Sequence, residues 1–231
     1  MTLAEIEAQA RQLGWPEEHI PFLALCCTPC VDLHLVPERP LAATGSRFGG
    51  SPCVPPDFSW PVHPAGRYRF LGQINFGEVA APATGLPTSG LLVLFHAEDE
   101  DGEVSWQDPG YVVGYHWDDL ASHATLQPPA DIPTVPGIAL DLVPGLNVPR
   151  HEELRNDWPF ATAPDLAWDL AQAVNADAYL LGHPAHCSLA YDPTPGPGWV
   201  SLLNVPSLPE LQWCWHDEDR LMVFIQAAQL A

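Results

Sequence analysis

Residues 67–76 read Arg67-Tyr68-Arg69-Phe70-Leu71-Gly72-Gln73-Ile74-Asn75-Phe76, a run that predicts a β-strand. Within it, Gln73 and Asn75 are two positions apart, so both side chains project from the same face of the strand. Amides on a buried face must find hydrogen-bond partners, and they can also hold a ligand. The stretch therefore provides both a strand of the fold and two candidate binding residues.

Parts of this region recur near the other end of the chain. Gly50-Ser51-Pro52 returns as Gly182-His183-Pro184, residues 71–74 match 202–205, and residues 91–95 match 221–225, in the same order and with nearly constant spacing. Chance similarity between short apolar strands is the alternative to a duplication. We expect a single domain over residues 1–231 with pseudo-repeats at about 46–96 and 178–226, and the groove between them as the place for a ligand.

The remaining pattern predicts an α+β fold of mostly antiparallel sheets, from two similar halves, with a few short helices. The 27 prolines and 17 glycines are too many for long helices. Helices are expected at 3–13, where Thr2 and Glu5 form a capping box, at 17–25, and at 165–175. Further strands are expected at 31–35, 90–96, 103–106, 111–115, 179–182, 199–205, 211–215 and 221–226. Residues 126–149 are proline-rich and are the candidate for an internal linker, with regular structure only in short pieces such as 138–142.

The composition is globular and strongly acidic. Hydrophobic residues make up 47% of the chain, and 29 acidic against 8 basic residues give a net charge of -21. Such a surface repels nucleic acid and anionic lipid, so we expect neither as a partner. The charge serves solubility, or else it attracts cationic partners. The start of the chain lacks a secretory signal and no run approaches the ~20 apolar residues of a membrane span, which predicts a cytoplasmic protein with reduced cysteines.

Several motifs resemble those of the YwqG-like family. They are residues 46–52 (Ser-Arg-Phe-Gly-Gly-Ser-Pro), Trp60-Pro61 and 70–76, followed by looser similarity at 181–184, 202–205 and 215–225. The resemblance implies a mixed α and β fold in a bacterial, intracellular protein with no established activity or catalytic residues. It also suggests an interaction or immunity role, since some relatives appear beside toxin systems. A glutamine usual in the family is not evident between Ala185 and Tyr191.

The tests for catalytic and metal motifs are negative or incomplete. Cys27 and Cys30, followed by His34, have the spacing of zinc ligands, but a second pair at matching spacing is absent. Cys187 could complete such a site if the fold brought it close. The alternative is buried free thiols. Serine-hydrolase, P-loop and calcium-loop patterns are not met. We therefore expect no metal and no cofactor.

Five residues are the candidate ligand contacts: Arg47, Gln73, Asn75, His183 and Asp217. A guanidinium beside a tight turn suits a forked grip on a carboxylate, although a structural ion pair with a nearby acid is the other reading of Arg47. The leading hypothesis is a non-catalytic binding or protein-interaction module whose partner is a protein or a small molecule, and an immunity protein is one form of it. The alternative is a small-molecule enzyme working between the two halves, with His183 or Asp217 transferring protons.

Overall fold

The structure is a computed structural model that describes residues 1–80, 85–98, 104, 110–150, 165–185, 191–215 and 218–230. Its helices are α1 (Leu3–Gln12), α2 (Leu23–Cys26) and α3 (Asp165–Val174), with short 3-10 turns η1 (Glu17–Phe22), η2 (Phe76–Glu78), η4 (Pro209–Leu211) and η5 (Ala227–Gln229). Its strands are β1 (Thr28–Val36), β2 (Arg47–Phe48), β3 (Cys53–Val54), β4 (Arg67–Asn75), β5 (Leu91–Glu98), β6 (Val112–Trp117), β7 (Ala124–Thr125), β8 (Ile138–Asn147), β9 (Tyr179–Leu181), β10 (Trp199–Pro206) and β11 (Arg220–Gln226).

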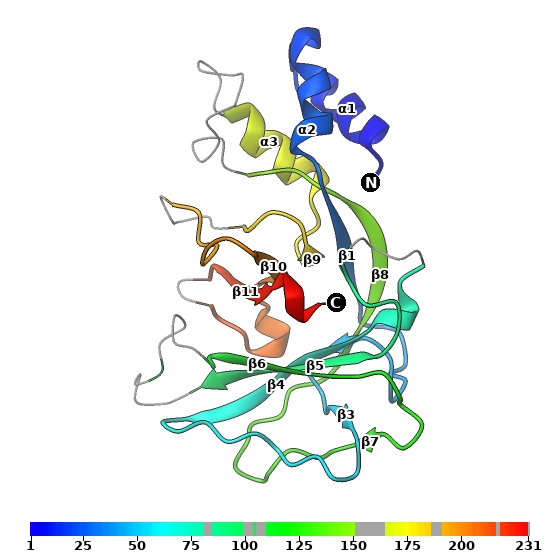
Figure 1. The fold of residues 1–231 in the computed structure, drawn as a ribbon, viewed down its shortest axis with the longest axis vertical. Helices are drawn as coiled ribbons and strands as arrows, with labels where there is room; N and C mark the ends of the chain where they lie inside the picture. Colours follow the sequence, from blue (N-terminus) through cyan, green and yellow to red (C-terminus); the bar gives the residue numbers. More distant parts are fainter. Residues whose placement is uncertain are drawn as a thin grey trace.

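Nine of these strands form one antiparallel sheet in the order β11-β10-β9-β1-β8-β2-β4-β5-β6. The long strands β1 and β8 pair along their length at its centre, and both curve from the helices down to β4, β5 and β6 (Figure 1). This curvature bends the sheet toward a nearly closed barrel whose two edge strands are β6 and β11. The expected mixture of mostly antiparallel sheet and a few short helices is confirmed.

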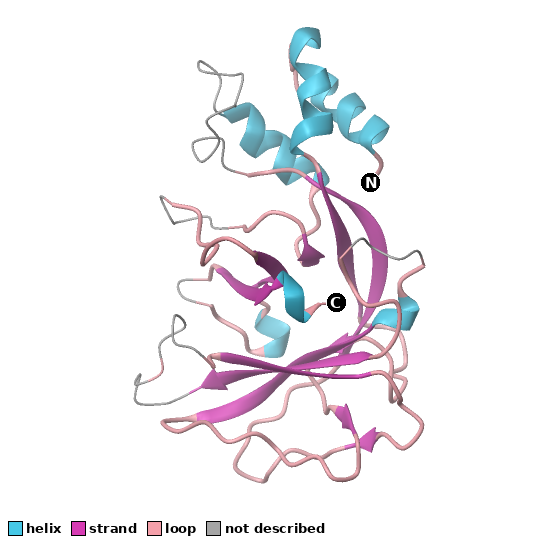
Figure 2. Ribbon diagram, viewed as in Figure 1, coloured by secondary structure: helices cyan, strands magenta, loops and turns pink. Residues whose placement is uncertain are grey.

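Three apolar clusters hold the described residues together. The largest fills the inside of the curved sheet and includes Leu71, Leu94 and Leu202. A second lies on the outer face of β4 and β5, where Phe95 packs under the segment that carries β3 and β7. The third joins the helices to one end of the barrel (Figure 2). Burying these side chains stabilises the fold by about 2 kcal/mol for each large residue.

The strands expected from alternating apolar residues are present, with shifted ends. Residues 31–35 lie in β1, 67–76 cover β4, and 221–226 lie in β11. Residues 103–106 lie outside the described residues except for Val104, so the expected hairpin there stays a prediction. The helix predicted at 165–175 is α3, one residue shorter at its end.

The prediction of a linker at 126–149 was wrong, although the short regular piece expected within it at 138–142 does lie in a strand. Its second half is β8, the longest strand, which pairs with both β1 and β2. Proline removes a backbone donor, so it is tolerated only where a strand lacks a neighbour on one side. Pro144 meets this condition, because β2 covers only Ile138 and Ala139 on that side of β8.

The strand predicted at 211–215 was also wrong. The alternation is real, since Leu211, Trp213 and Trp215 are buried while Gln212 and Cys214 are exposed. However, the chain there leaves the turn η4 as a loop, and Gln212 adopts a left-handed conformation with φ of 56°. Side chains can therefore alternate in burial without a strand partner.

The helices α1, α2 and α3 lie together at one end of the molecule, and we call them the helical lobe (Figure 1). The lobe begins at the capping box that the sequence predicts. The Thr2 hydroxyl accepts the backbone N–H of Glu5 at 3.4 Å, and the Glu5 carboxylate accepts the backbone N–H of Thr2 at 2.8 Å. These bonds satisfy donors that the first turn of a helix leaves without partners. Ile6 and Ala10 of α1 then pack against α3. None of the described helices is both long and apolar enough to cross a membrane.

Replacing Thr2 with alanine is expected to lower the free energy of unfolding by about 1 kcal/mol, because the Glu5 N–H loses its acceptor. Thr2→Ser keeps the hydroxyl and should remain within about 0.3 kcal/mol of the parent protein. Urea unfolding followed by circular dichroism measures both. Equal losses in the two variants would show that the cap does not stabilise the lobe.

Candidate functional site

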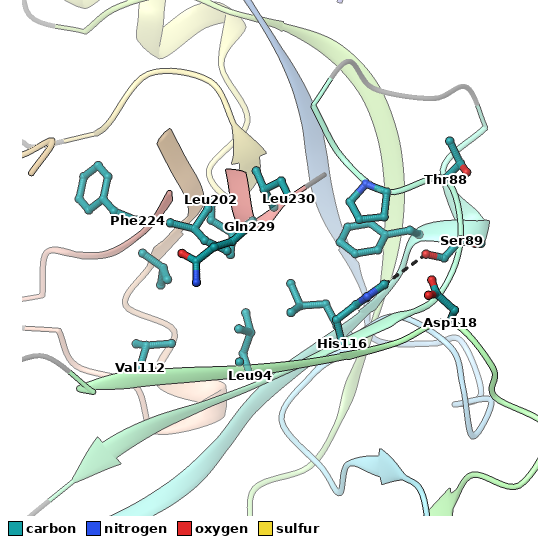
Figure 3. Close-up of a pocket in the computed structure, with 16 residues that line it drawn as sticks. Thr88, Ser89, Leu94, Val112, His116, Asp118, Leu202, Phe224, Gln229 and Leu230 are labelled. Atoms are coloured by element: carbon teal, nitrogen blue, oxygen red, sulfur yellow. Dashed lines mark hydrogen bonds between the residues drawn. The ribbon is translucent and has the colours of Figure 1, made fainter. Parts of the chain in front are cut away.

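A cavity of about 660 Å³ lies inside the curved sheet, between β5 and β6 on one side and β10 and β11 on the other (Figure 3). We call it the central cavity. Its lining residues come from two segments of the chain, 76–118 and 202–230, and the turn η5 borders it. It is lined by Phe76, Pro87, Thr88, Ser89, Leu92, Leu94, Val112, Gly114, His116, Asp118, Leu202, Val223, Phe224, Ile225, Gln229 and Leu230.

The inner wall of the central cavity is apolar and belongs to the largest core cluster. Leu94 and Leu202 are each 3% exposed and form part of that cluster. Val112, Val223 and Leu230 pack against the same cluster but are only partly buried. The cavity is therefore an opening through which solvent reaches the edge of the main core.

One end of the central cavity is polar. His116 Nε2 lies 3.3 Å from the Ser89 carbonyl oxygen, and Asp118, just after β6, is on the same side (Figure 3). A carbonyl only accepts, so Nε2 donates in this contact and carries the proton. In a neutral ring, Nδ1 is then an acceptor. His116 and Asp118 are both exposed, so this end faces water.

Two glycines give the cavity its shape. Gly90 has φ of 93°, and a Cβ there would come within 2.8 Å of the Trp117 carbonyl oxygen as well as against the His116 ring. A side chain at this position would therefore push His116 away from Ser89. Gly114, in the middle of β6, has no side chain of its own to fill the space beside Leu94.

The structure brings together three of the five predicted site residues, away from the central cavity. Arg47 on β2 lies directly opposite Gln73 on β4. Arg47 Nη1 donates to the carbonyls of Ala42, Ala43 and Gly45 at 3.1, 2.9 and 3.2 Å, and Nη2 donates to the Ser51 carbonyl. Arg47 is 3% exposed, and burial lowers its pKa. The sequence suggested either a carboxylate ligand or an ion pair with a nearby acid as the partner of Arg47. The hydrogen-bond partners in the structure are backbone carbonyls.

The two amides complete this cluster, which we call the loop anchor. Gln73 Nε2 donates to the carbonyls of Ala43 and Gly45, and its Oε1 accepts the backbone N–H of Cys53 at 2.9 Å. Asn75 Nδ2 donates to the Thr44 carbonyl at 3.0 Å. Neither amide nor Arg47 lines the central cavity. Ligand binding by these three residues stays a prediction.

The other two predicted residues are not brought to the loop anchor. His183 follows β9, and its Nε2 lies 2.8 Å from the Cys26 carbonyl oxygen and 3.1 Å from the Thr28 hydroxyl. Its backbone N–H donates to Asn147 Oδ1 at 3.0 Å. His183 thus ties the helical lobe to the barrel, outside the central cavity. Asp217 lies outside the described residues.

The cysteines near β1 do not gather into a metal site in the part of the chain that the structure describes. The Cys30 thiol donates to Asp32 Oδ1 at 3.4 Å, and burial together with the Asp32 charge raises its pKa. His34 is exposed on the same strand. Cys187 lies outside the described residues, so its part in a site stays untested.

Sequence reasoning missed the residues that line the central cavity. Along β6, Gly114, His116 and Asp118 alternate with bulky apolar side chains such as Tyr115 and Trp117. A strand with small or polar residues on one face and large apolar ones on the other shows which face is open. The sequence therefore contained a signal for the open face of β6. Which distant strands lie across the cavity from that face depends on the tertiary structure, and the local pattern does not contain it.

Comparison with protein-family models places the chain in a family. A family model described as a domain of unknown function (DUF1963) matches residues 46–231. This agrees with the resemblance seen in the motifs, and the matched range contains every residue that lines the central cavity. No curated protein matches the chain.

Proposed function

The chain belongs to the DUF1963 family, whose description names no activity, and we propose that it is a non-catalytic binding protein whose central cavity holds a small ligand with an apolar body. One observation carries this proposal: the largest apolar cluster is open to solvent at the central cavity. An apolar group that enters there removes both its own surface and the exposed edge of the core from water. Each 100 Å² buried contributes about 2.5 kcal/mol.

The size and lining of the central cavity support this reading. Its volume of about 660 Å³ falls in the range of small-molecule sites, which combine apolar walls with a few polar groups. A protein partner could use the same opening by inserting an apolar side chain. That mode would fit the interaction or immunity role that the family resemblance suggests.

Catalysis in the same cleft is the weaker alternative. Among the described residues that line the cavity, only His116 and Asp118 have side chains that can transfer a proton, and His116 Nε2 already contacts the Ser89 carbonyl. The donors of Arg47 and Gln73, which the enzyme hypothesis uses to position a substrate, are already engaged by the loop anchor.

We also propose that the segments at about 46–96 and 178–226 arose by duplication and that the central cavity lies between them. The strand order supports this, because β9, β10 and β11 follow one another on one side of the central pair as β2, β4 and β5 do on the other. Each half also has one register shift at a matching place, between Phe70 and Gly72 in β4 and between Ser201 and Leu203 in β10.

A buried amide makes the same hydrogen bond in each half. Gln73 Oε1 accepts the backbone N–H of Cys53 at 2.9 Å, and Asn204 Oδ1 accepts that of Ala185 at 3.1 Å. Gln73 pairs with β2, and Asn204 pairs with β9 at the matching register position. A side-chain bond repeated in this way is more specific than a repeated apolar pattern.

In each half, two consecutive residues with a left-handed backbone conformation come shortly before the residue whose N–H the amide accepts. Gly49 and Gly50 have φ of 64° and 76°, and Leu181 and Gly182 have φ of 59° and 75°. Leucine rarely adopts this conformation, so the surrounding fold must impose it. The same backbone turn therefore supports a common origin for the two halves.

We place this binding function in the bacterial cytoplasm. The described cysteines Cys27, Cys30 and Cys53 are free thiols, which suits a reducing compartment. The predominance of acidic residues keeps such a protein dissolved at neutral pH.

The neutral dye N-phenylnaphthylamine tests the binding proposal, because its fluorescence rises in apolar surroundings. We expect saturable binding that Gly114→Val weakens at least about tenfold. A Cβ at Gly114 would lie 3.0 Å from Leu94 Cδ2, so valine fills the space that the dye needs. Gly114→Ala should have an intermediate effect.

Ala124→Val is the matched control, because it adds apolar volume to an exposed residue of β7 that does not line the cavity. It should bind the dye like the parent protein, and circular dichroism and thermal unfolding must show that all variants fold. Absence of saturable dye binding, or equal affinity in Gly114→Val, would contradict the proposal.

A further inference from the structure

We propose that the ligand of the central cavity is an amphipathic cation, with an ammonium or guanidinium group at Asp118 and an apolar body against Leu94 and Leu202. This inference rests on the proposed function and adds the ligand's charge to it. It is carried by the charges around the cavity, the acceptors at its polar end, and the separation of that end from the apolar wall.

Negative charge is fixed in the central cavity, and no described arginine lines it. Asp118 is the one carboxylate among the described lining residues. The sequence contains no lysine, so its 8 basic residues are all arginines. Six of the described arginines have partners elsewhere: Arg11 with Glu17, Arg39 with Asp141, Arg67 and Arg69 with Glu98, Arg220 with Asp177, and Arg47 with the loop anchor.

An anionic ligand would therefore meet repulsion without a compensating charge. The net charge of -21 extends this preference beyond the cavity, because the field of the whole protein concentrates cations near its surface. The field of the protein attracts any cation to the surface. The cavity adds a specific position for the positive charge, next to Asp118.

The polar end of the cavity is rich in hydrogen-bond acceptors. The Ser89 carbonyl already accepts from His116 Nε2 and has a second lone pair, and neutral His116 can accept at Nδ1. Asp118 accepts at both carboxylate oxygens. An ammonium group has three donors and no acceptor, so it matches this set where a carboxylate would not.

Aromatic faces lie near the same end. The Phe76 ring is 5.8 Å from the His116 ring, and Phe76 lines the cavity. Cations are attracted to the face of an aromatic ring when they lie within about 6 Å of its centre. Phe76 thus provides a surface that tolerates both the charged group and the apolar body of an amphipathic cation.

The two ends fix the orientation of the ligand. Figure 3 shows Asp118, Ser89 and His116 together at one side of the cavity, and Leu94, Val112 and Leu202 at a distance from them. A ligand with its charge at Asp118 therefore directs its apolar part toward Leu94 and the core. This arrangement predicts that affinity depends on both parts of the molecule.

Three probes of nearly equal shape test the inference: phenylbutylamine, phenylbutanol and phenylbutanoate. Displacement of N-phenylnaphthylamine at about pH 7 and low salt gives each affinity. We expect the amine to bind at least about tenfold more tightly than the carboxylate, with the alcohol between them. Equal affinities for the amine and the carboxylate, while the dye still binds, would overturn the ligand class and leave the proposed function intact.

Asp118→Asn should weaken amine binding about fivefold and leave alcohol binding within about twofold. Asp119→Asn is the matched control: it removes the same charge from the next residue, which is exposed and does not line the cavity. An equal loss in both variants would show that the general field, and not Asp118, selects the cation. Failure of the dye and all three probes to bind would instead overturn the proposed function.

Discussion

Replacing Arg47 with methionine is expected to destabilise the fold by about 3–5 kcal/mol. Methionine fills much of the space but donates no hydrogen bond, so the carbonyls of Ala42, Ala43, Gly45 and Ser51 all lose their guanidinium donor. These carbonyls lie around a side chain that is 3% exposed, where water cannot replace the lost donors without opening the loop. Urea unfolding measures the loss.

Arg39→Met is the matched control for this prediction. Arg39 also bonds a carbonyl and pairs with Asp141, but its side chain is 42% exposed. The same substitution there should cost less than about 1 kcal/mol, because solvent screens exposed ion pairs. If Arg47→Met were no more destabilising than Arg39→Met, the loop anchor would not be a structural element, and the ligand role predicted for Arg47 would gain support.

Local patterns in the sequence were enough to predict many individual strands and helices, but not how the strands pair in the sheet. Strands such as β4 and β11 follow from their apolar content, and α1 follows from Thr2 and Glu5, because neighbours in sequence determine these features. The pairing of β1 with β8 depends on residues that are far apart in sequence. The prolines suggested a linker with regular structure only in short pieces such as 138–142. The strand can continue through Pro144 because β2 does not pair with that part of β8.

For the candidate site, too, the region and the individual residues must be considered separately. The expected pseudo-repeats directed attention to a groove between them. The central cavity lies between β5–β6 and β10–β11, and the duplication itself stays a proposal. The individual residues were chosen by chemical type, as a rare arginine and two amides. Such groups are also what a buried loop needs to satisfy its carbonyls, and Arg47, Gln73 and Asn75 do this in the structure.

Trp215 shows how a tertiary contact creates a property that no sequence pattern contains. Its ring packs edge-on against His96, with ring centroids 5.0 Å apart, and covers this histidine on the inner face of β5. His96 is 4% exposed, and its Nε2 has no hydrogen-bond partner in the described structure. Burial, and then the charge of Arg69, lower the pKa of His96 to about 4, although the Ala97 carbonyl and Glu98 oppose the shift.

Stability is therefore expected to fall as the pH drops from about 6.5 to about 4. In this window the unfolded chain binds a proton at His96 and the folded protein does not, so lower pH favours unfolding. The contribution of His96 is fully present above about pH 6.5, and the pKa difference corresponds to a loss of about 3 kcal/mol by pH 4.

His96→Leu removes the titrating group while keeping an apolar side chain of similar size beside Trp215. The variant should lose about 2–3 kcal/mol less stability than the parent protein between about pH 7 and pH 4.5. Carboxylates that titrate in the same range affect both proteins equally, so the difference isolates His96. Urea unfolding at a series of pH values measures it.

His34→Leu is the control, since it removes an exposed histidine from β1 and so separates burial from the loss of a titratable group. Parallel pH curves for His96→Leu and the parent protein would mean that water or a hydrogen bond reaches Nε2 and stabilises the charged ring. A flatter curve for His96→Leu alone would show that Trp215 keeps this histidine neutral. Because His96 follows Leu94 on the same face of β5, acid would then weaken the fold next to the central cavity.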